Sequence, residues 1–169
     1  HGTNFLSVMP TNLYGPGDNY ELQGSHVLPA MIRKFHEAKI NKTDKVELWG
    51  DGSPLREFLY SEDLADAVVY LMENCNASDL RTPTGDFVNV GSGIELTIKE
   101  LAETICEIVY EDCSNRKCTL SWDSSKPNGT PRKLCDITRL LNLGWKPKTN
   151  LKAGIKLAYQ DFLSGNVKL

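Results

Sequence analysis

The chain has 169 residues, of which 40% are hydrophobic and 24% charged, a composition typical of one globular unit large enough to bury a core. Its net charge of -3 mixes both signs, so we expect no broad basic surface for nucleic acid or for an anionic membrane. No apolar run approaches the ~18 residues that span a bilayer and no signal peptide opens the sequence, which favours a soluble, cytoplasmic protein.

Five cysteines form an odd set without a Cys-x-x-Cys pair, and they stand at positions 75, 106, 113, 118 and 135. Such a set indicates neither a full disulfide framework nor a zinc site, so we predict no metal-binding site. A reducing cytoplasm fits these thiols best.

The start of the chain alternates short apolar runs with amphipathic stretches, which is typical of an α/β fold. We predict a strand over residues 5–9, and then a ligand-binding loop over residues 12–19, which are rich in Gly, Pro, Asn and Asp. Ser25 is expected to cap a helix, because three apolar residues follow it at helical spacing: Leu28, Ile32 and Phe35.

The next part of the chain predicts two strands, over residues 46–49 and 57–60, with the turn 50–54 between them. We expect this unit to be a hairpin-like loop that carries Arg56. Ser61 then caps a helix with one apolar stripe, formed by Leu64, Val68, Leu71 and Cys75.

The last third of the chain again predicts alternating strands and helices. Residues 87–90 read as a buried strand ended by glycines, and Thr97 with Glu100 forms a capping-box pattern that opens a helix. The remaining predicted elements are a strand over 117–122, a second ligand-binding loop over 123–133, a closing helix with Leu151, Ile155, Ala158 and Phe162 on one stripe, and a frayed end over 167–169.

Cationic residues gather in two of the polar loops. They are Arg56, Lys126, Arg132 and Lys133. Arginine offers a rigid fork of donors that matches phosphate oxygens and lysine offers a mobile point charge, so the group suits a diphosphate. The alternative interpretation is a set of solvated surface charges.

Trp49 and His26 are the two other residues with a chemical interpretation. Trp49 could stack on a planar base or a sugar, or could be a core tryptophan that ends a strand, whereas Trp122 and Trp145 are assigned to packing. His26 lies at the start of a predicted helix, where an imidazole can exchange protons near neutral pH. The alternative is a structural histidine in an apolar helix.

Two motifs of nicotinamide-dependent reductases do not occur in the sequence. Gly91 and Gly93 make only a Gly-x-Gly, not the full Gly-x-Gly-x-x-Gly fingerprint, and none of the six tyrosines has a lysine four residues on. We therefore expect the phosphate-gripping loop and the reductase acid to lie outside this sequence.

Six segments stand together in an order that is specific to one family: residues 9–16 (MPTNLYGP), 25–30 (SHVLPA), 49–60 (WGDGSPLREFLY), 63–67 (DLADA), 89–93 (NVGSG) and 125–133 (SKPNGTPRK). Over essentially its whole length the chain resembles the extended short-chain dehydrogenase/reductases, and among them the GDP-L-fucose synthase family. The Asn-x-Tyr-Gly-Pro and Arg-Glu-Phe motifs are shared by many nucleotide-sugar epimerases and dehydratases, whereas the segments 25–30 and 125–133 are more specific.

The resemblance implies a fold made of the end of an NAD(P)-binding Rossmann domain, residues 1–24, and a small α/β substrate-binding domain, residues 25–169, with the strand 87–91 returning to the Rossmann sheet. It also implies an NADP(H)-dependent enzyme that epimerises GDP-4-keto-6-deoxy-D-mannose at C3 and C5 and reduces it at C4, and that acts as a homodimer. The opening residues are not methionine and run directly into a strand pattern. We expect a C-terminal part of a longer enzyme, inactive alone, with the strand edge and face that the missing half covers exposed.

The resemblance also assigns site residues. His26 is the implied proton donor and also contacts the cofactor, and the residues implied to line the nicotinamide side are Pro10, Thr11, Asn12 and Leu13. The residues implied to hold the GDP-sugar are Lys34, Trp49, Arg56, Asn128 and Lys133. Lys34 stands where the family often has arginine and Asn128 where it has aspartate, and neither change excludes GDP binding.

Two alternative functions remain open at this point. One is another activity of the same superfamily, such as a 4,6-dehydratase or a 4-epimerase. The other is a binding module that holds a GDP-sugar without redox chemistry.

Overall fold

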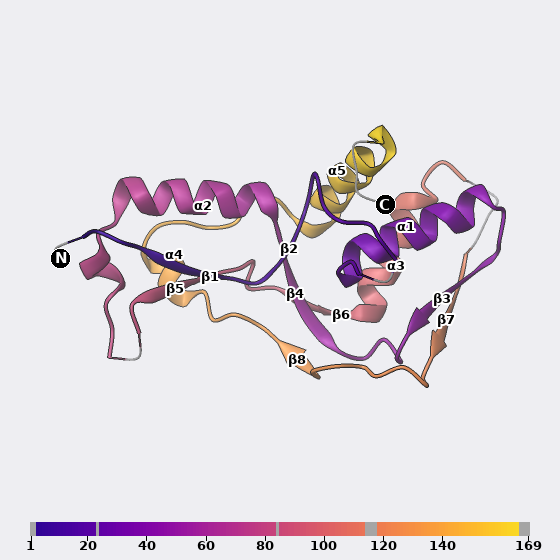
Figure 1. Cartoon of the computed structure of the whole chain (residues 1–169), viewed down its shortest axis with the longest axis horizontal. Helices are drawn as coiled ribbons and strands as arrows, with labels where there is room; N and C mark the ends of the chain where they lie inside the picture. Colours follow the sequence, from indigo (N-terminus) through magenta and orange to yellow (C-terminus); the bar gives the residue numbers. More distant parts are fainter. Residues whose placement is uncertain (1–2, 23, 84, 114–117, 166–169) are drawn as a thin grey trace.

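The computed structural model describes residues 3–22, 24–83, 85–113 and 118–165, and these residues form two lobes joined by a central pair of strands (Figure 1). The elements in chain order are β1 (Ser7–Pro10), β2 (Asn12–Tyr14), α1 (Val27–Ile40), β3 (Lys45–Trp49), β4 (Leu55–Tyr60), α2 (Ser61–Asn74), the 3-10 helix η1 (Ala77–Leu80), β5 (Phe87–Val90), β6 (Glu95–Thr97), α3 (Ile98–Val109), β7 (Thr119–Asp123), β8 (Arg132–Lys133), α4 (Thr138–Asn142) and α5 (Leu151–Ser164). The chain is therefore an α/β protein, as its sequence pattern predicts.

The first lobe contains β1, β5, α2 and α4 (Figure 1). β1 and β5 pair in parallel from Ser7↔Phe87 to Pro10↔Val90, so two strands about 80 residues apart in sequence meet in one sheet, as parallel pairs do through long crossovers. Their inner side chains pack with α2 and α4 around buried residues that include Leu71, Val88 and Leu140.

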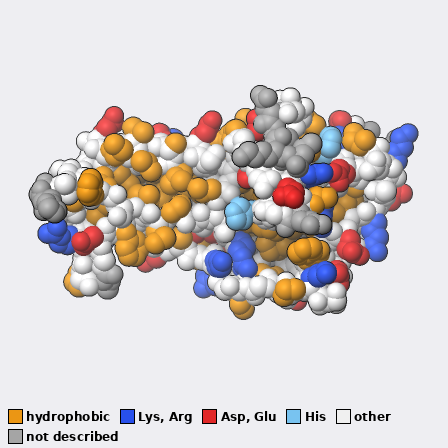
Figure 2. Space-filling view, viewed as in Figure 1, with side chains coloured by type: hydrophobic (Ala, Val, Ile, Leu, Met, Phe, Trp, Pro, Cys, Tyr) orange, Lys and Arg blue, Asp and Glu red, His pale blue; other side chains and the backbone are white. Residues whose placement is uncertain are grey.

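The outer face of the first lobe is apolar. Figure 2 shows hydrophobic side chains spread over this end of the molecule, and Phe5 is 80% exposed and Met9 is 54% exposed. Exposed apolar side chains thus lie on β1, at Met9, and just before it, at Phe5.

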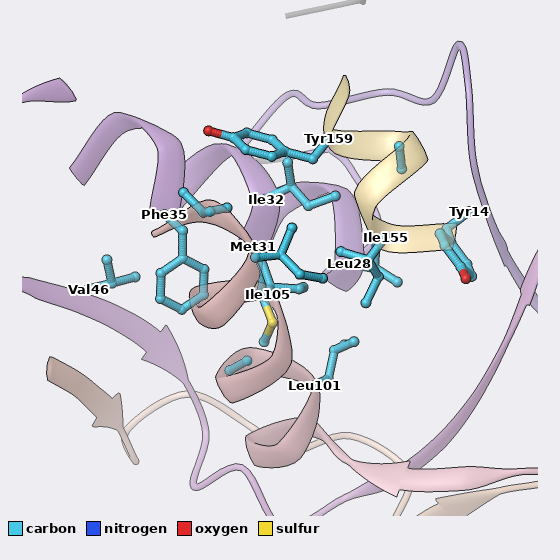
Figure 3. Close-up of a cluster of buried hydrophobic side chains, with 14 of the residues drawn as sticks. Tyr14, Leu28, Met31, Ile32, Phe35, Val46, Leu101, Ile105, Ile155 and Tyr159 are labelled. Atoms are coloured by element: carbon cyan, nitrogen blue, oxygen red, sulfur yellow. The ribbon is translucent and has the colours of Figure 1, made fainter. Parts of the chain in front are cut away.

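The second lobe packs α1, α3 and α5 together with the parallel pair β3 and β7. Figure 3 shows its core, in which Leu28, Ile32 and Phe35 of α1 face Leu101 and Ile105 of α3. The three α1 residues are at most 1% exposed, which confirms the predicted stripe. On the third helix, Ile155 and Ala158 of the predicted α5 stripe are also buried.

β4 connects the two lobes, because its alternate side chains enter different cores. Phe58 and Tyr60 belong to the core of the second lobe, while Leu59 between them belongs to the core of the first. β4 pairs in parallel with β2 along 58–60, antiparallel with β6 along 55–57 and in parallel with β8 along 55–56. A strand buried on both faces and paired with three partners fixes how the lobes sit against each other.

The structure corrects three local predictions. The residues 46–49 and 57–60 do not form a hairpin, since β3 pairs with β7 and β4 pairs with β2, β6 and β8; strand partners are chosen by long-range burial, which local spacing does not encode. The predicted loop 12–19 begins with the short strand β2.

The third correction concerns Ser25, which does not cap α1. The helix begins one residue later than predicted, with His26 at the N-cap and no side-chain cap, and the Ser25 hydroxyl is buried. By contrast, the capping box is confirmed, since the Thr97 hydroxyl accepts the Glu100 amide at 3.1 Å and Glu100 accepts the Thr97 amide at 2.7 Å.

Parts of two predictions, Lys117 and residues 167–169, lie outside the described residues. Within the part of the chain that the structure describes, no helix is both long and apolar enough to cross a bilayer.

Candidate ligand-binding site

His26 faces an open pocket of about 460 Å³ at the junction of the two lobes, lined by residues 11–18, His26 and Ser61. Its side chain is exposed and its backbone is fixed by the start of α1, where the His26 carbonyl accepts the amide of Ala30 at 3.1 Å. His26 is therefore not buried in the core, and its role in proton transfer stays a prediction.

Asp18 is a residue of this pocket that sequence reasoning missed. Burial raises the pKa of the Asp18 carboxyl, while its hydrogen bond from the Asn19 amide and the nearby His26 oppose that rise. An acid and an imidazole thus share one pocket wall, an arrangement typical of proton-transfer sites. The only sequence signal for Asp18 was its place in the Gly/Pro/Asn/Asp loop.

Hydrogen bonds to the backbone of β4 fix the part of the pocket lining that contains Thr11 and Asn12. The side-chain amide of Asn12 donates to the main-chain carbonyl of Glu57 at 2.7 Å, and the Thr11 hydroxyl donates to the same carbonyl at 3.3 Å. These two side chains therefore bind the protein itself and fix β2, which ends at Tyr14, in the pocket lining. Pro10 is exposed at the end of β1 and is not part of the pocket lining.

Trp49 lies between two lysines at the end of β3. Its side chain is 61% exposed, which makes the core alternative wrong. The amine of Lys34 lies 5.8 Å and that of Lys126 lies 5.6 Å from the centroid of the indole ring, within the range of cation–π attraction. Burial lowers the pKa of the Lys34 amine, opposed by the nearby Glu47 carboxylate. A flat π surface with two cations beside it suits an anionic ligand that carries a planar group.

A second cavity links Trp49 to the start of α1. It has a volume of about 230 Å³, and its lining includes Ser25, Val27, Lys34 and Trp49. Ser25 and Val27 flank His26 in sequence, so this cavity and the His26 pocket both border the N-terminus of α1.

Arg56 and Lys133 are direct neighbours in the sheet, where they are register partners across β4 and β8. The two predicted cation loops therefore converge. Arg132, the residue before Lys133, is turned away and forms a bidentate pair with Glu95, with both distances 2.7 Å. Sequence reasoning could not separate these two adjacent cations, because only the register of β8 against β4 decides which one lies beside Arg56.

Asn128 holds the 123–133 loop onto the turn between β3 and β4. Its side-chain oxygen accepts the amide of Asp51 at 2.8 Å. A Cβ on Gly50 would collide with that same side chain, and Gly50 also has φ of 80°, so glycine is required there. In this structure Asn128 thus orders the loop that carries Lys126 and Lys133, and whether it also contacts ligand stays a prediction.

Most of the predicted site residues fall into three groups: the His26 pocket, the pair Lys34 and Trp49, and the pair Arg56 and Lys133. Figure 2 shows Lys and Arg side chains gathered beside a histidine near the middle of this face.

Comparison with protein families identifies the class. Residues 1–91 match the model of the NAD dependent epimerase/dehydratase family. The chain belongs to this family. Within it, the chain is 49% identical over 163 residues to GDP-L-fucose synthase 1 of Arabidopsis thaliana and 46% identical over 165 residues to GDP-L-fucose synthase of Escherichia coli, covering 96% of this chain in both cases and 47% and 50% of those proteins.

A solved structure has the same fold as this chain. It is a GDP-L-fucose synthetase from Naegleria fowleri bound to NADP, with a TM-score of 0.78 and 30% identity, and the match covers 95% of this chain and 47% of that one. The chain thus spans about half the length of the curated epimerase/dehydratase relatives it matches.

Proposed function

We propose that this chain is the substrate-binding, C-terminal part of an NADP-dependent GDP-4-keto-6-deoxy-D-mannose 3,5-epimerase/4-reductase that makes GDP-L-fucose. The observation that supports this most is the convergence of Arg56 and Lys133 on adjacent strands, together with an exposed imidazole at the N-cap of α1. The similar proteins named GDP-L-fucose synthase supply the substrate class.

Each group has a role in this proposal. Arg56 and Lys133 hold the diphosphate, because two cations on neighbouring strands match its paired negative charges. Trp49 stacks on the guanine or on the sugar, with Lys34 at its edge. Asn128 keeps the loop of Lys133 in place and provides an acceptor to the nucleotide.

His26 is the proposed catalytic acid of the epimerisation. The 4-keto group acidifies the protons on C3 and C5, so a base can remove one from one face and an acid can return one to the other face. The open His26 pocket, with Asp18 on its wall, gives the imidazole access to a sugar and a carboxylate to orient it.

This chain supplies only part of the proposed binding site for NADP(H). Pro10, Thr11, Asn12 and Leu13 would line the nicotinamide side together with His26, since Thr11 and Asn12 are anchored to β4 and give a rigid wall. When bound, NADPH supplies the hydride for C4. The sequence holds neither the glycine fingerprint nor a Tyr-x-x-x-Lys pair, so both would have to come from protein outside these 169 residues.

A second candidate function is a binding module that holds the GDP-sugar without reducing it, which the same two missing motifs favour for the chain by itself. NADPH consumption by the gene product that contains this chain separates the two. Product analysis separates a third possibility, a 4-epimerase or dehydratase of the same family, because these do not consume NADPH stoichiometrically.

Calorimetric titration with GDP tests the substrate-binding role. We expect the gene product to bind GDP more tightly than UDP, and Arg56→Ala and Lys133→Ala each to weaken binding by about tenfold, because each removes a charge-assisted contact to phosphate. Lys156→Ala is the matched control: it removes the same charge from a lysine of α5 that pairs with Glu111, just after α3, and that lines none of the candidate pockets. Equal affinity for GDP in all variants contradicts the assignment.

Deuterium exchange tests His26. In D₂O the unmodified enzyme should give a product that is inverted and deuterated at C3 and C5 of the sugar, and His26→Asn should lose this inverted product while GDP affinity is retained. Undiminished formation of the inverted product by His26→Asn excludes His26 as the acid. We also propose that the full-length enzyme is a cytoplasmic homodimer. Analytical ultracentrifugation of the same preparation tests the homodimer.

A further inference from the structure

Glu57 is the most deeply buried charged residue among those that the structure describes, at 0% exposure, and it stands next to Arg56 on β4. A carboxylate out of water is costly unless hydrogen bonds satisfy it. Each of its oxygens accepts one backbone amide: Oε1 that of Gly93 at 2.7 Å and Oε2 that of Cys135 at 2.8 Å.

Through its bond to Cys135, Glu57 adds a side-chain hydrogen bond to those by which β4 pairs with the segment that carries Lys133. The amide of Leu55 donates to the Pro131 carbonyl at 2.9 Å, and β8 then pairs along Leu55 and Arg56. β8 ends at Lys133, so the amide of Cys135 has left the strand ladder, and the Glu57 side chain takes the place of a ladder acceptor. Figure 1 shows β8 running beside β4 in this part of the molecule.

The loop on the other side of Glu57 is shaped to admit its carboxylate. A Cβ on Gly91 would lie 2.9 Å from Cδ of Glu57 and closer still to Oε1. The main-chain carbonyl of Glu57 meanwhile accepts both Thr11 and Asn12. One residue thus joins the wall of the His26 pocket to the segment of Lys133.

We propose that Glu57 is a positioning residue for substrate binding: its buried carboxylate holds the segment after β8 against β4 and so keeps Lys133 beside Arg56 to bind the substrate diphosphate. This inference rests on the proposed function. Glu57 does not touch the ligand itself, since it is closed off from solvent between three backbone segments.

The test is GDP affinity of the gene product with Glu57→Gln. The amide keeps one acceptor oxygen but presents an NH₂ to the second backbone amide, which is then left without an acceptor. We expect about tenfold weaker GDP binding and a raised KM for the GDP-sugar with kcat little changed, the pattern of lost ground-state binding.

Two further variants separate positioning from a general loss of stability. Asp63→Asn is the matched control, because Asp63 is also buried, at 4% exposure, and accepts the amides of Lys148 and Thr149 at 3.0 and 2.8 Å. It should lower the melting temperature without changing GDP affinity. In a Lys133→Ala background, Glu57→Gln should weaken GDP binding little further, because it acts through Lys133.

If Glu57→Gln does not fold, Gly91→Ala replaces it as the test variant. The added Cβ displaces the Glu57 side chain without changing its chemistry, and this variant should also weaken GDP binding. The inference is overturned if Glu57→Gln, or Gly91→Ala in its place, leaves GDP affinity unchanged, if Asp63→Asn weakens it as much, or if the loss is undiminished in the Lys133→Ala background. Absence of GDP binding by the unmodified protein overturns the proposed function as well, whereas GDP binding that these variants do not alter overturns this inference alone.

Discussion

Gly154 offers a sharp test of how α5 supports the wall of the His26 pocket. It lies buried in the interior of α5, against the ring of Tyr14, which lines the pocket. A Cβ at position 154 would lie 3.0 Å from Cζ and 3.2 Å from Cε2 of Tyr14, and nearer still to its hydroxyl. Tyr14 is 2% exposed and has edge contacts with Phe58 and Tyr60, at centroid distances of 6.4 and 5.8 Å.

Two effects of Gly154→Ala oppose each other. Alanine in a helix interior is favoured over glycine by about 1 kcal/mol, and overpacking a filled core costs about 1–3 kcal/mol. The Tyr14 ring is hemmed in by two aromatic rings, so the steric cost should fall at the upper end of that range. We expect Gly154→Ala to lower the free energy of unfolding by about 1–2 kcal/mol.

Urea unfolding followed by circular dichroism measures this change. Ala153→Gly, at the exposed neighbouring position of the same helix, calibrates the propensity term. Tyr14→Phe removes the hydroxyl that approaches closest, at the cost of its long hydrogen bond of 3.4 Å to the Leu151 carbonyl. Adding Tyr14→Phe to Gly154→Ala should therefore recover part of the loss. A Gly154→Ala protein that is more stable than the unmodified one would refute the reasoning, because it would show that the ring yields freely.

Two other predictions concern local stability. Thr97→Ala should lower the free energy of unfolding by about 1 kcal/mol in the same urea assay, because it removes the side-chain half of the capping box at the start of α3, whereas Thr97→Ser should cost much less; equal losses would contradict this. Burial lowers the pKa of His36 below its ordinary value of 6.5, with Lys39 adding to the effect and Glu37 opposing it. The unfolded chain then binds a proton at His36 more readily than the folded chain does. The free energy of unfolding is therefore highest above about pH 6.5 and falls as the pH drops below 6.5. Melting temperatures between about pH 7 and pH 5 should therefore drop less in His36→Gln, and parallel curves for the two proteins would rule this out.

The sequence allowed the elements of the second lobe to be predicted well, because their periodicity is set by burial in one core. The stripe of α1 and the capping box of α3 depend on residues within a few positions of one another, and both are present. The hairpin of β3 and β4 was wrong for the opposite reason. β3 pairs with β7 and β4 with β2, β6 and β8, all from distant parts of the chain. A short apolar run carries no information about which distant strand it pairs with.

The same distinction applies to the site. The cation loops were visible as charge in polar segments, and their meeting at Arg56 and Lys133 follows from a register that only the fold decides. Glu57 was not recognised, because a glutamate in a strand gives no sign that it will be closed off from water between backbone amides. Asp18 was hidden in a loop whose composition predicts a turn as readily as a pocket wall.

The alternation along β4 has a consequence for how this protein can vary. Removing or adding one residue between Leu55 and Tyr60 would exchange the two cores that Leu59 and its neighbours fill, and would also break the match of Arg56 with Lys133. Insertions and deletions among relatives should therefore avoid this strand and collect in the exposed 124–131 loop. For the same reason neither lobe can melt while the other stays intact, since the strand they share would have to leave both at once, and heating should give one cooperative transition.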